Sequence, residues 1–299
     1  MTLEKLEEQR IKIRNFYIIT FVIAAVGAVL LVAFKVPEIA IFYVFAVILI
    51  AGLIENKTNK EYLNNFKKFF VKSALETKFT NLKYTPNQGM SYQTIASTKM
   101  LYMGDRYHSN DFISGKYKDI DFSQADVHIE EERETTDSDG NTRTYYVTLF
   151  RGRWMIFDFN KTFKADLQVC QKGFGNNKTG NGLFSKDVFH RVKMESEEFN
   201  KAFNIYAQSE HEAFYILTPA LMEKIMKLDK MNSGKLLLCF INNRLHIGLN
   251  DGKDSFEHAP IWKKIDPEKT KSKIADDINQ ITMFVDELDL DNDLFRKGV

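Results

Sequence analysis

The chain of 299 residues contains 41 lysines and arginines and 40 aspartates and glutamates, so its formal net charge is +1. This balance argues against a general nucleic-acid-binding protein, which carries a clear basic excess. The two cysteines, Cys170 and Cys239, lack the spacing of a disulfide framework. They are typical of a protein in a reducing compartment rather than of a small secreted domain.

Two apolar segments near the N-terminus have the composition of membrane-spanning helices. Residues 16–34 would extend roughly 28 Å as a helix, close to the ~30 Å hydrocarbon core of a bilayer. Residues 39–54 would extend roughly 24 Å, which local thinning of the bilayer accommodates. Both segments are apolar on every face, whereas a core helix of a soluble protein is rarely so apolar over this length. We therefore expect two transmembrane helices.

Four residues, Lys35-Val36-Pro37-Glu38, separate the two apolar segments. A single helix through both would place Lys35 and Glu38 near the bilayer centre, where a charge costs a few kcal/mol. Pro37 also disfavours an uninterrupted helix. The sequence therefore predicts a helical hairpin with an extracytoplasmic turn at 35–38. The first segment is too long for the apolar region of a cleaved signal peptide.

Lysines and arginines predict the orientation, because they concentrate on the cytoplasmic side of membrane spans. The predicted turn has only Lys35, and the basic residues near the spans lie on their other side: Lys5, Arg10, Lys12, Arg14, Lys57, Lys60, Lys67, Lys68 and Lys72. We expect residues 1–15 and everything after residue 54 in the cytoplasm, with the lipid bilayer as the first partner of the chain.

Residues 55–83 are predicted to form a juxtamembrane helix rich in basic and aromatic residues. Its sequence FKKFFVK could lie on the membrane, with rings at the interface and lysines on anionic headgroups. This interpretation predicts membrane-surface contacts by six residues: Phe66, Lys67, Lys68, Phe69, Phe70 and Lys72. The alternative is a stalk helix whose aromatic residues pack on the soluble domain. The pattern alone leaves both open.

Residues 84–299 are predicted to form a cytoplasmic α+β domain. Ser91 is expected to cap a helix that runs to about Met103. Alternating runs from Asp111 to Cys170 predict an antiparallel meander. Asp139-Gly140 marks one hairpin, because glycine supplies the positive φ of a tight turn, and Arg151-Gly152 is interpreted as a second turn.

A glycine- and asparagine-rich loop at 173–182 is a candidate boundary between two halves of this domain. After it we expect a helix capped by Ser196 that includes Phe199 and Phe203, and then a strand, AFYILT. Thr218-Pro219 begins another helix, with threonine as cap and proline at the first position. Asn242-Asn243 joins two strands, and Asp266-Pro267 opens a long amphipathic helix.

Several short motifs resemble catalytic or ligand-binding sequences, but each lacks features that such a site requires. GNNKTG, residues 175–180, lacks the Gly-Lys-Ser/Thr ending of a phosphate-binding loop. DLDND, residues 289–293, lacks the glycine and the final glutamate of a calcium loop. SEHE, residues 209–212, is interpreted as a surface loop. None of the six histidines stands at metal-ligand spacing from another or from a cysteine: His108, His128, His190, His211, His246 and His258. We therefore predict no catalytic, cofactor-binding or metal-binding residues and no cofactor.

Trp154, with Arg151 and Arg153 beside it, is an unusual cluster. Aromatic and arginine side chains together can form an anion-binding or nucleic-acid-binding surface. Strand alternation places Trp154 and Ile156 on one face, where a covering helix or loop would bury them. We favour ordinary packing for this cluster.

Four segments of the chain together carry a resemblance to a known family: SGKYKDIDF, FRGRW, FHRVKMESEEFNKAFNIYA and AFYILTPALMEKI. After two amino-terminal spans, they resemble a bacterial family catalogued as domain of unknown function 3137. The resemblance extends over the hairpin and most of the chain to about Leu249, and it is most specific at Met194-Glu195-Ser196 and Leu217-Thr218-Pro219. It implies a two-pass protein of the bacterial inner membrane and carries no catalytic residues.

The sequence therefore favours a membrane-anchored cytoplasmic binding module over an enzyme. Its further partners would be another protein, a lipid headgroup or a second copy of the chain. The alternative is a membrane-tethered enzyme, for which a converging pocket of titratable groups would be the sign.

Overall fold

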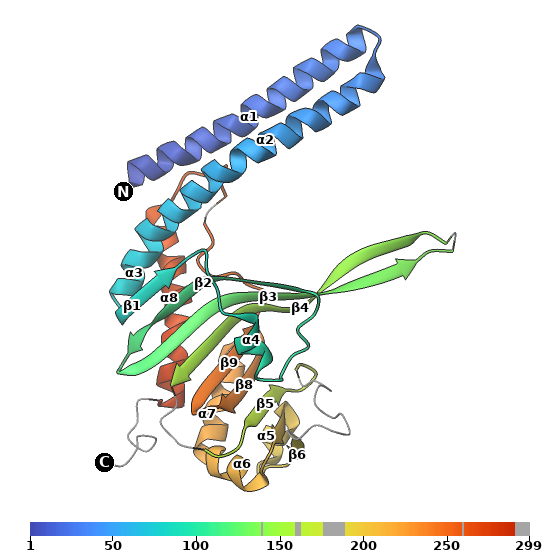
Figure 1. The fold of residues 1–299 in the computed structure, drawn as a ribbon. Helices are drawn as coiled ribbons and strands as arrows, with labels where there is room; N and C mark the ends of the chain where they lie inside the picture. The colour runs from blue at the N-terminus through green and yellow to red at the C-terminus, as the bar shows by residue number, and fades with distance from the viewer. Residues whose placement is uncertain (139, 159–162, 176–188, 259, 291–299) are drawn as a thin grey trace. The chain divides into compact units, whose positions relative to one another are not determined.

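A computed structural model describes the chain except for residues 139, 159–162, 176–188, 259 and 291–299 (Figure 1). The chain forms two compact units. The first, the hairpin unit, comprises Met1–Ala74 and Phe256–Ala275. The second, the sheet unit, comprises Leu75–Ser255 and Asp276–Val299. The predicted α+β class is confirmed: a pair of long apolar helices precedes an antiparallel sheet with helices.

The hairpin unit is built on helices α1, Leu3–Ala33, and α2, Pro37–Phe66. Lys35, at φ 63°, lies in the turn between them, and Pro37 is at the start of α2, where its fixed φ suits a first helical turn. Both helices are long and apolar enough to cross a membrane, and only 6% of the apolar window of each is buried. The predicted helical hairpin is therefore present in the structure.

The second helix continues well past residue 55, where we expected a separate juxtamembrane helix. α2 is followed without a break by a π-helical segment, Lys67–Lys72, and by α3, Ser73–Glu76. No glycine or proline interrupts the sequence between Leu53 and Lys78, so nothing stops the helix there. The end of the predicted 55–83 segment belongs instead to the first strand, which begins at Thr80.

The sheet unit contains one antiparallel sheet with the strand order β1-β2-β3-β4-β9-β8-β5-β7-β6 among the described residues. Its strands are β1 Thr80–Thr85, β2 Arg106–Tyr117, β3 Ile120–Thr136, β4 Thr142–Asp158, β5 Leu167–Gln171, β6 His190–Val192, β7 Phe203–Ala207, β8 Lys235–Ile241 and β9 Arg244–Asn250. Strand β5 precedes the predicted boundary at 173–182, yet it pairs with β7 and β8, which follow it. Most of that segment lies outside the described residues.

Each face of the sheet has its own apolar layer. On one face, Trp154 and Ile156 pack with Ala125, Val127 and the short helix α4, Tyr92–Ala96. On the other face lies the part of α8, Pro267–Leu288, that belongs to this unit (Figure 1). Its buried residues follow the predicted amphipathic pattern: Ile278, Ile281, Phe284, Val285 and Leu288. Arg153, on this face, reaches α8 through hydrogen bonds to Asp277.

Four predicted helix starts are confirmed. The side chains of Ser91, Ser196 and Thr218 accept hydrogen bonds from the first turns of α4, α5 (Glu197–Ala202) and α7 (Pro219–Met231). α8 begins at Pro267 as expected. However, α4 ends at Ala96 rather than near Met103. The Asn242-Asn243 turn is confirmed as well, with both residues at positive φ.

Three predictions of local structure were wrong in this region. The segment AFYILT lies mostly in a helix, α6, Glu210–Ile216. Phe203, expected in the helix that Ser196 caps, instead begins strand β7, FNIYA. Helix α6 is capped by Ser209, which accepts from Glu212 N, so SEHE is a helix start and not a loop. Hydrophobic residues in such short runs fit either period, and tertiary pairing with β5 and β6 decides.

Arg151-Gly152 does not form a turn either, because both residues lie within the long strand β4. Gly152 has a different role. A Cβ there would lie 2.0 Å from the carbonyl oxygen of Leu249 on the neighbouring strand, so only glycine fits. The turn that we did not predict is Lys118-Asp119, at φ 47° and 63°, between β2 and β3.

Candidate functional site

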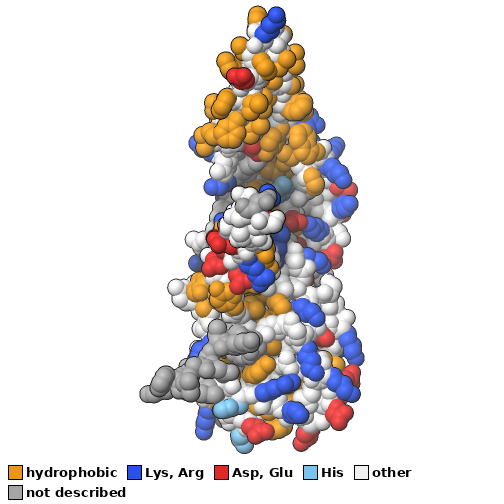
Figure 2. All heavy atoms as spheres, turned by 90° about the vertical axis from the view of Figure 1, so that its right-hand side faces the viewer, with side chains coloured by type: hydrophobic (Ala, Val, Ile, Leu, Met, Phe, Trp, Pro, Cys, Tyr) orange, Lys and Arg blue, Asp and Glu red, His pale blue; other side chains and the backbone are white. Residues whose placement is uncertain are grey.

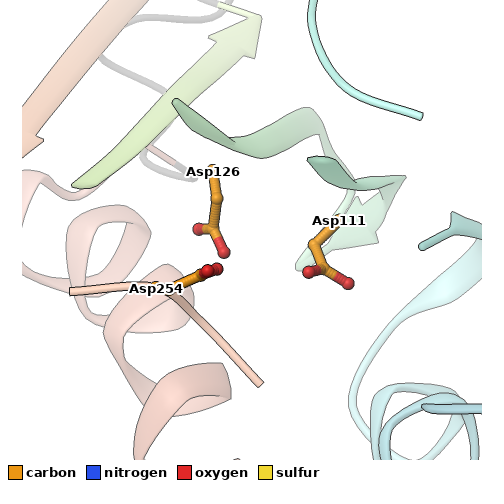
Figure 3. A group of neighbouring side chains, drawn as sticks. All are labelled: Asp111, Asp126 and Asp254. Carbon is orange, nitrogen blue, oxygen red and sulfur yellow. The ribbon is translucent and has the colours of Figure 1, made fainter. Parts of the chain in front are cut away.

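Three aspartates from separate segments of the sheet unit form the candidate site: Asp111, Asp126 and Asp254 (Figure 3). Their carboxylate oxygens lie within 4.8 Å of one another. Asp111 and Asp126 are 0% and 3% exposed, and Asp254 is half-buried. In Figure 3 the carboxyl groups of Asp126 and Asp254 point toward each other, with Asp111 beside them. So many acids rarely meet in a protein interior without a compensating group.

A bulge in strand β2 positions Asp111. The β2–β3 register runs from Asn110↔Asp126 to Ile113↔Gln124, so β2 has one more residue than β3 between these pairs. Asp111 lies in that bulge at φ 53°, a left-handed conformation that aspartate tolerates better than most residues. Bulges of this kind re-aim side chains next to functional sites. Asp254 comes from the segment after β9.

Hydrogen bonds hold the two buried carboxylates. The backbone N–H and the hydroxyl of Ser255 donate to Asp126 at 2.6 and 2.7 Å. The hydroxyl of Tyr84 donates to Asp111 Oδ1 at 2.6 Å, and the side-chain amide of Asn110 donates to Oδ2 at 2.8 Å. These donors fix the carboxylates in one geometry, as ligands and acid–base groups require.

Burial raises the pKa of Asp126 well above its usual value, and a hydrogen bond with Asp254 and the charge of Asp111 add to the effect. Burial is also the main reason why the pKa of Tyr84 is raised. The shift of Asp126 favours a proton shared between two carboxyl groups when no cation is bound. Closely spaced carboxylates are equally the ligands that Ca²⁺ and Mg²⁺ prefer. The cluster can thus hold a proton or a hard cation.

Gln124 lies on the same face of β3 as Asp126, two residues before it. Its side chain is 0% exposed, and neither atom of its amide has a hydrogen-bond partner in the described part of the chain. A buried amide without partners costs ~1–3 kcal/mol.

No motif in the sequence points to this cluster. Its members are far apart in the chain, and each stands in a locally ordinary context. A bulge in β2 and a loop after β9 bring them together, and neither has a sequence signal that we could identify.

The residues predicted to touch the membrane fall into two groups. The rings of Phe66 and Phe70 are buried, 5.1 Å apart, and Phe66 also packs against His258. These two rings are therefore part of the packing of the hairpin unit, whereas the stalk alternative placed them on the soluble domain. We do not propose their contact with a membrane further. Lys68 and Lys72 are exposed, whereas Lys67 and Phe69 are half-buried. Contact of these four side chains with lipid stays a prediction.

The Trp154 cluster is ordinary packing, as we favoured. Trp154 is fully buried, and its indole N–H donates to Nδ1 of His246 at 3.3 Å. Burial lowers the pKa of His246 to about 4, so the ring is neutral at pH 7. Arg153 is buried as well and forms an ion pair with Asp277 at 2.5 Å. Arg151 is exposed at the surface.

Two motifs set aside above, the phosphate-loop-like GNNKTG and the calcium-loop-like DLDND, lie partly outside the described residues. In the loop at 175–180, the structure describes Gly175 alone, and from DLDND it describes only Asp289 and Leu290. Asp289 forms an ion pair with Lys224.

Comparisons with known proteins match part of the chain to a protein family. Residues 148–290 match the model of a family described as "Protein of unknown function (DUF3137)". The resemblance is confirmed for this region, which begins after the hairpin and extends beyond Leu249. No curated protein matches the chain significantly.

Among solved structures, the chain is similar to the crystal structure of the mycobacterial trehalose monomycolate transport factor A, TtfA. The sequence identity is 9% and the TM-score is 0.39, over 79% of this chain and 97% of the other. So distant a likeness carries no argument about function.

Proposed function

We propose that the chain is a membrane-anchored binding module of the bacterial inner membrane. In this proposal α1 and α2 cross the bilayer as a hairpin, and the sheet unit binds a protein partner or a second copy of the chain in the cytoplasm. The surface of the hairpin is the observation that carries the proposal. Phe21, Ile41 and Phe42 are 74%, 74% and 75% exposed, and Figure 2 shows hydrophobic side chains covering the hairpin. Hydrocarbon is the solvent that suits such a surface.

The distribution of basic residues supports the cytoplasmic orientation of both termini, as the sequence analysis argued. Most of them remain accessible to headgroups and water, with Lys12, Lys68 and Lys72 among the exposed ones. Arg10 is the exception, because its guanidinium is buried against Glu7.

The outer part of the β3–β4 hairpin supports a binding role for the sheet unit. Among the described residues, 131–136 pair only with 142–147, because β2 ends its pairing at Glu130 and β9 begins at Arg153. This two-stranded arm projects from the rest of the sheet (Figure 1). Most of its residues are exposed, among them Tyr145 at 46%. A two-stranded ribbon is marginally stable alone, so a partner along its open edges would stabilise it.

A membrane-tethered enzyme is the second candidate function, and the aspartate cluster is the observation that favours it. Buried carboxyl groups with a raised pKa are common in active sites. Because Asp254 is only half-buried, a substrate or cation could reach the buried carboxylates of Asp111 and Asp126 from its side.

Extraction of membranes with alkaline carbonate tests the anchor. We expect the full chain to stay in the membrane pellet, and its release into the soluble fraction would contradict the proposal. A detergent pull-down then compares the chain with a variant whose arm is shortened by replacing residues 134–144 with Asn-Gly, so that the paired residues Arg133 and Tyr145 flank the new turn. Loss of a specific partner, or of self-association, in that variant alone would support the binding role. Identical captures by both chains would argue against a role of the arm.

A further inference from the structure

The segment that precedes α8 returns to the first helix, although Glu7 and Ile265 are 258 residues apart in the sequence. The backbone N–H of Ile265 donates to the Glu7 carboxylate at 3.3 Å. The guanidinium of Arg10 donates to the carbonyl oxygen of Ile261, and it is itself held by Glu7 at 2.6 Å. One face of α1 thus fixes both ends of residues 261–265 within the hairpin unit.

Between these fixed points, Trp262 is brought to the edge of the apolar part of the hairpin. Its ring lies 5.9 Å from that of Tyr17, which is in the first turn of the predicted span 16–34. The Tyr17 hydroxyl and the side-chain amide of Asn59 both donate to the carboxylate of Glu55, just after the second span. These polar groups mark the level at which both helices leave the apolar region.

The chemistry of the segment suits the boundary between lipid and water. Trp262 is 58% exposed even though it contacts Tyr17, so a large apolar surface remains uncovered. Lys263 and Lys264 follow it, and both are exposed. An indole ring is favourable at the headgroup level, and lysines beside it attract anionic lipids.

We propose that residues 260–264, Pro-Ile-Trp-Lys-Lys, form a second membrane contact. Trp262 lies among the headgroups of the leaflet that the hairpin enters, and Lys263 and Lys264 bind anionic headgroups of that leaflet. This inference rests on the proposed membrane anchor, because the contact is continuous with the surface of α1. The occupant is the lipid bilayer itself rather than a further protein.

The experiment uses the full chain reconstituted into anionic vesicles of phosphatidylcholine with phosphatidylglycerol and into neutral vesicles of phosphatidylcholine alone, both of which contain brominated lipids. Bromine quenches tryptophan fluorescence at short range. The chain has two tryptophans, and Trp154 is fully buried in the sheet unit, so it provides an internal unquenched signal. The variant Trp262→Phe changes an exposed side chain and leaves that signal in place. Sedimentation of the chain with the vesicles is measured in parallel.

We expect bromines near the headgroups to quench part of the wild-type fluorescence and bromines deep in the bilayer to quench less. The Trp262→Phe variant should lose this quenching and still sediment with the vesicles. Replacing Lys263 and Lys264 with glutamine should reduce the quenching in anionic vesicles only. Equal, weak quenching of wild type and Trp262→Phe, with both chains still in the vesicle pellet, would overturn this inference and leave the anchor intact. A chain that does not sediment with vesicles would overturn both.

Discussion

The apolar part of the hairpin, residues 16–54, and the sheet unit treat their large apolar side chains in opposite ways. In the hairpin, Phe21, Phe42 and Leu53 are 74%, 75% and 73% exposed. In the sheet unit, Phe150 and Trp154 are 0% exposed. Burial in protein stabilises an apolar side chain when the surroundings are water, and no such burial is needed in hydrocarbon. The difference supports the proposal that the hairpin faces hydrocarbon and the sheet unit faces water, and the following predictions test that division.

The largest effect should come from separating the units. A fragment of residues 75–299 lacks both long helices and retains all described strands of the sheet. It also keeps residues 256–275 of the hairpin unit, because they connect the two segments of the sheet unit. We expect it to leave the membrane fraction and to unfold cooperatively in water, as followed by circular dichroism. A fragment that begins at Ser91 is a poorer choice, because it loses the edge strand β1.

Persistent aggregation of the 75–299 fragment without an unfolding transition would contradict an autonomous sheet unit. The hairpin fragment of residues 1–74 is the matched control, and it should require detergent or lipid.

The same kind of truncation should destabilise the sheet unit when it is made there and have no such effect when it is made in the hairpin. Trp154→Ala removes a fully buried ring, and we expect a loss of about 3–5 kcal/mol in the free energy of unfolding of the sheet unit. Phe21→Ala removes a ring on the exposed hairpin surface and should leave that unfolding unchanged. Chemical denaturation of both full-length variants in the same detergent measures the difference. A similar loss from both would contradict the proposed division.

The buried histidine should make the sheet unit sensitive to acid. Burial lowers the pKa of His246 to about 4 in the folded state, so the unfolded chain binds a proton more readily between pH 6.5 and pH 4. The stabilisation is complete above pH 6.5 and is lost as the pH falls through 4. The pKa falls from 6.5 in the unfolded chain to about 4 in the folded one. At about 1.4 kcal/mol for each pKa unit, this difference amounts to roughly 3 kcal/mol.

Unfolding of the 75–299 fragment as a function of pH measures this contribution. Replacing His246 with glutamine should flatten that part of the profile, and replacing the exposed His211 should not. An unchanged profile in the His246 variant would show that other groups cause the acid sensitivity.

The aspartate cluster should give the opposite pH dependence. Because the folded-state pKa of Asp126 is raised, its contribution is complete at low pH and is lost as the pH rises through that pKa. Each pKa unit of difference corresponds to about 1.4 kcal/mol. The variant Asp254→Asn should weaken this loss, whereas the exposed turn variant Asp119→Asn should leave it in place.

Addition of calcium at high pH distinguishes a cluster that can hold only a proton from one that can also hold a cation. Recovery of stability on addition of Ca²⁺ to the metal-free wild type, and not to Asp254→Asn, would show that a cation replaces the proton. A flat profile in the wild type would contradict the shared proton.

The smallest expected effects, per side chain, concern the basic segment at the end of the hairpin. If Lys67, Lys68 and Lys72 lie on anionic headgroups, each contributes about 1 kcal/mol. Replacing all three with glutamine in a peptide of residues 55–79 should reduce its partitioning into anionic vesicles by roughly a hundredfold. High salt should do the same, because it screens the charges. Equal binding to neutral and anionic vesicles would contradict the electrostatic contribution.

The parts of the fold that sequence could predict share a local physical cause. The two long apolar helices follow from apolar composition. The starts of α5 and α7 follow from Ser196 and Thr218, whose side chains satisfy free backbone N–H groups. The Asn242-Asn243 turn follows from residues that tolerate positive φ. In these cases the residues that carry the signal also make the interaction.

The parts that sequence could not predict depend on distant partners. FNIYA forms a strand because β5 and β6 flank it. Gly152 is needed because Leu249 approaches, although the same Arg-Gly pair looks like a turn. The aspartate cluster depends on a bulge and a loop, and the place of Trp262 depends on contacts with α1. Only tertiary structure brings such residues together.

A pair of topology reporters tests the central claim most directly. A reporter active only in the cytoplasm is fused after Val299, and one active only after export is inserted at the Pro37 turn. The division of the chain into a lipid-facing hairpin and a cytoplasmic sheet unit predicts that both are active. Activity of the cytoplasmic reporter at both positions would show that the hairpin does not cross the membrane. Exchanged activities would place the sheet unit outside the cell membrane and contradict the proposed orientation.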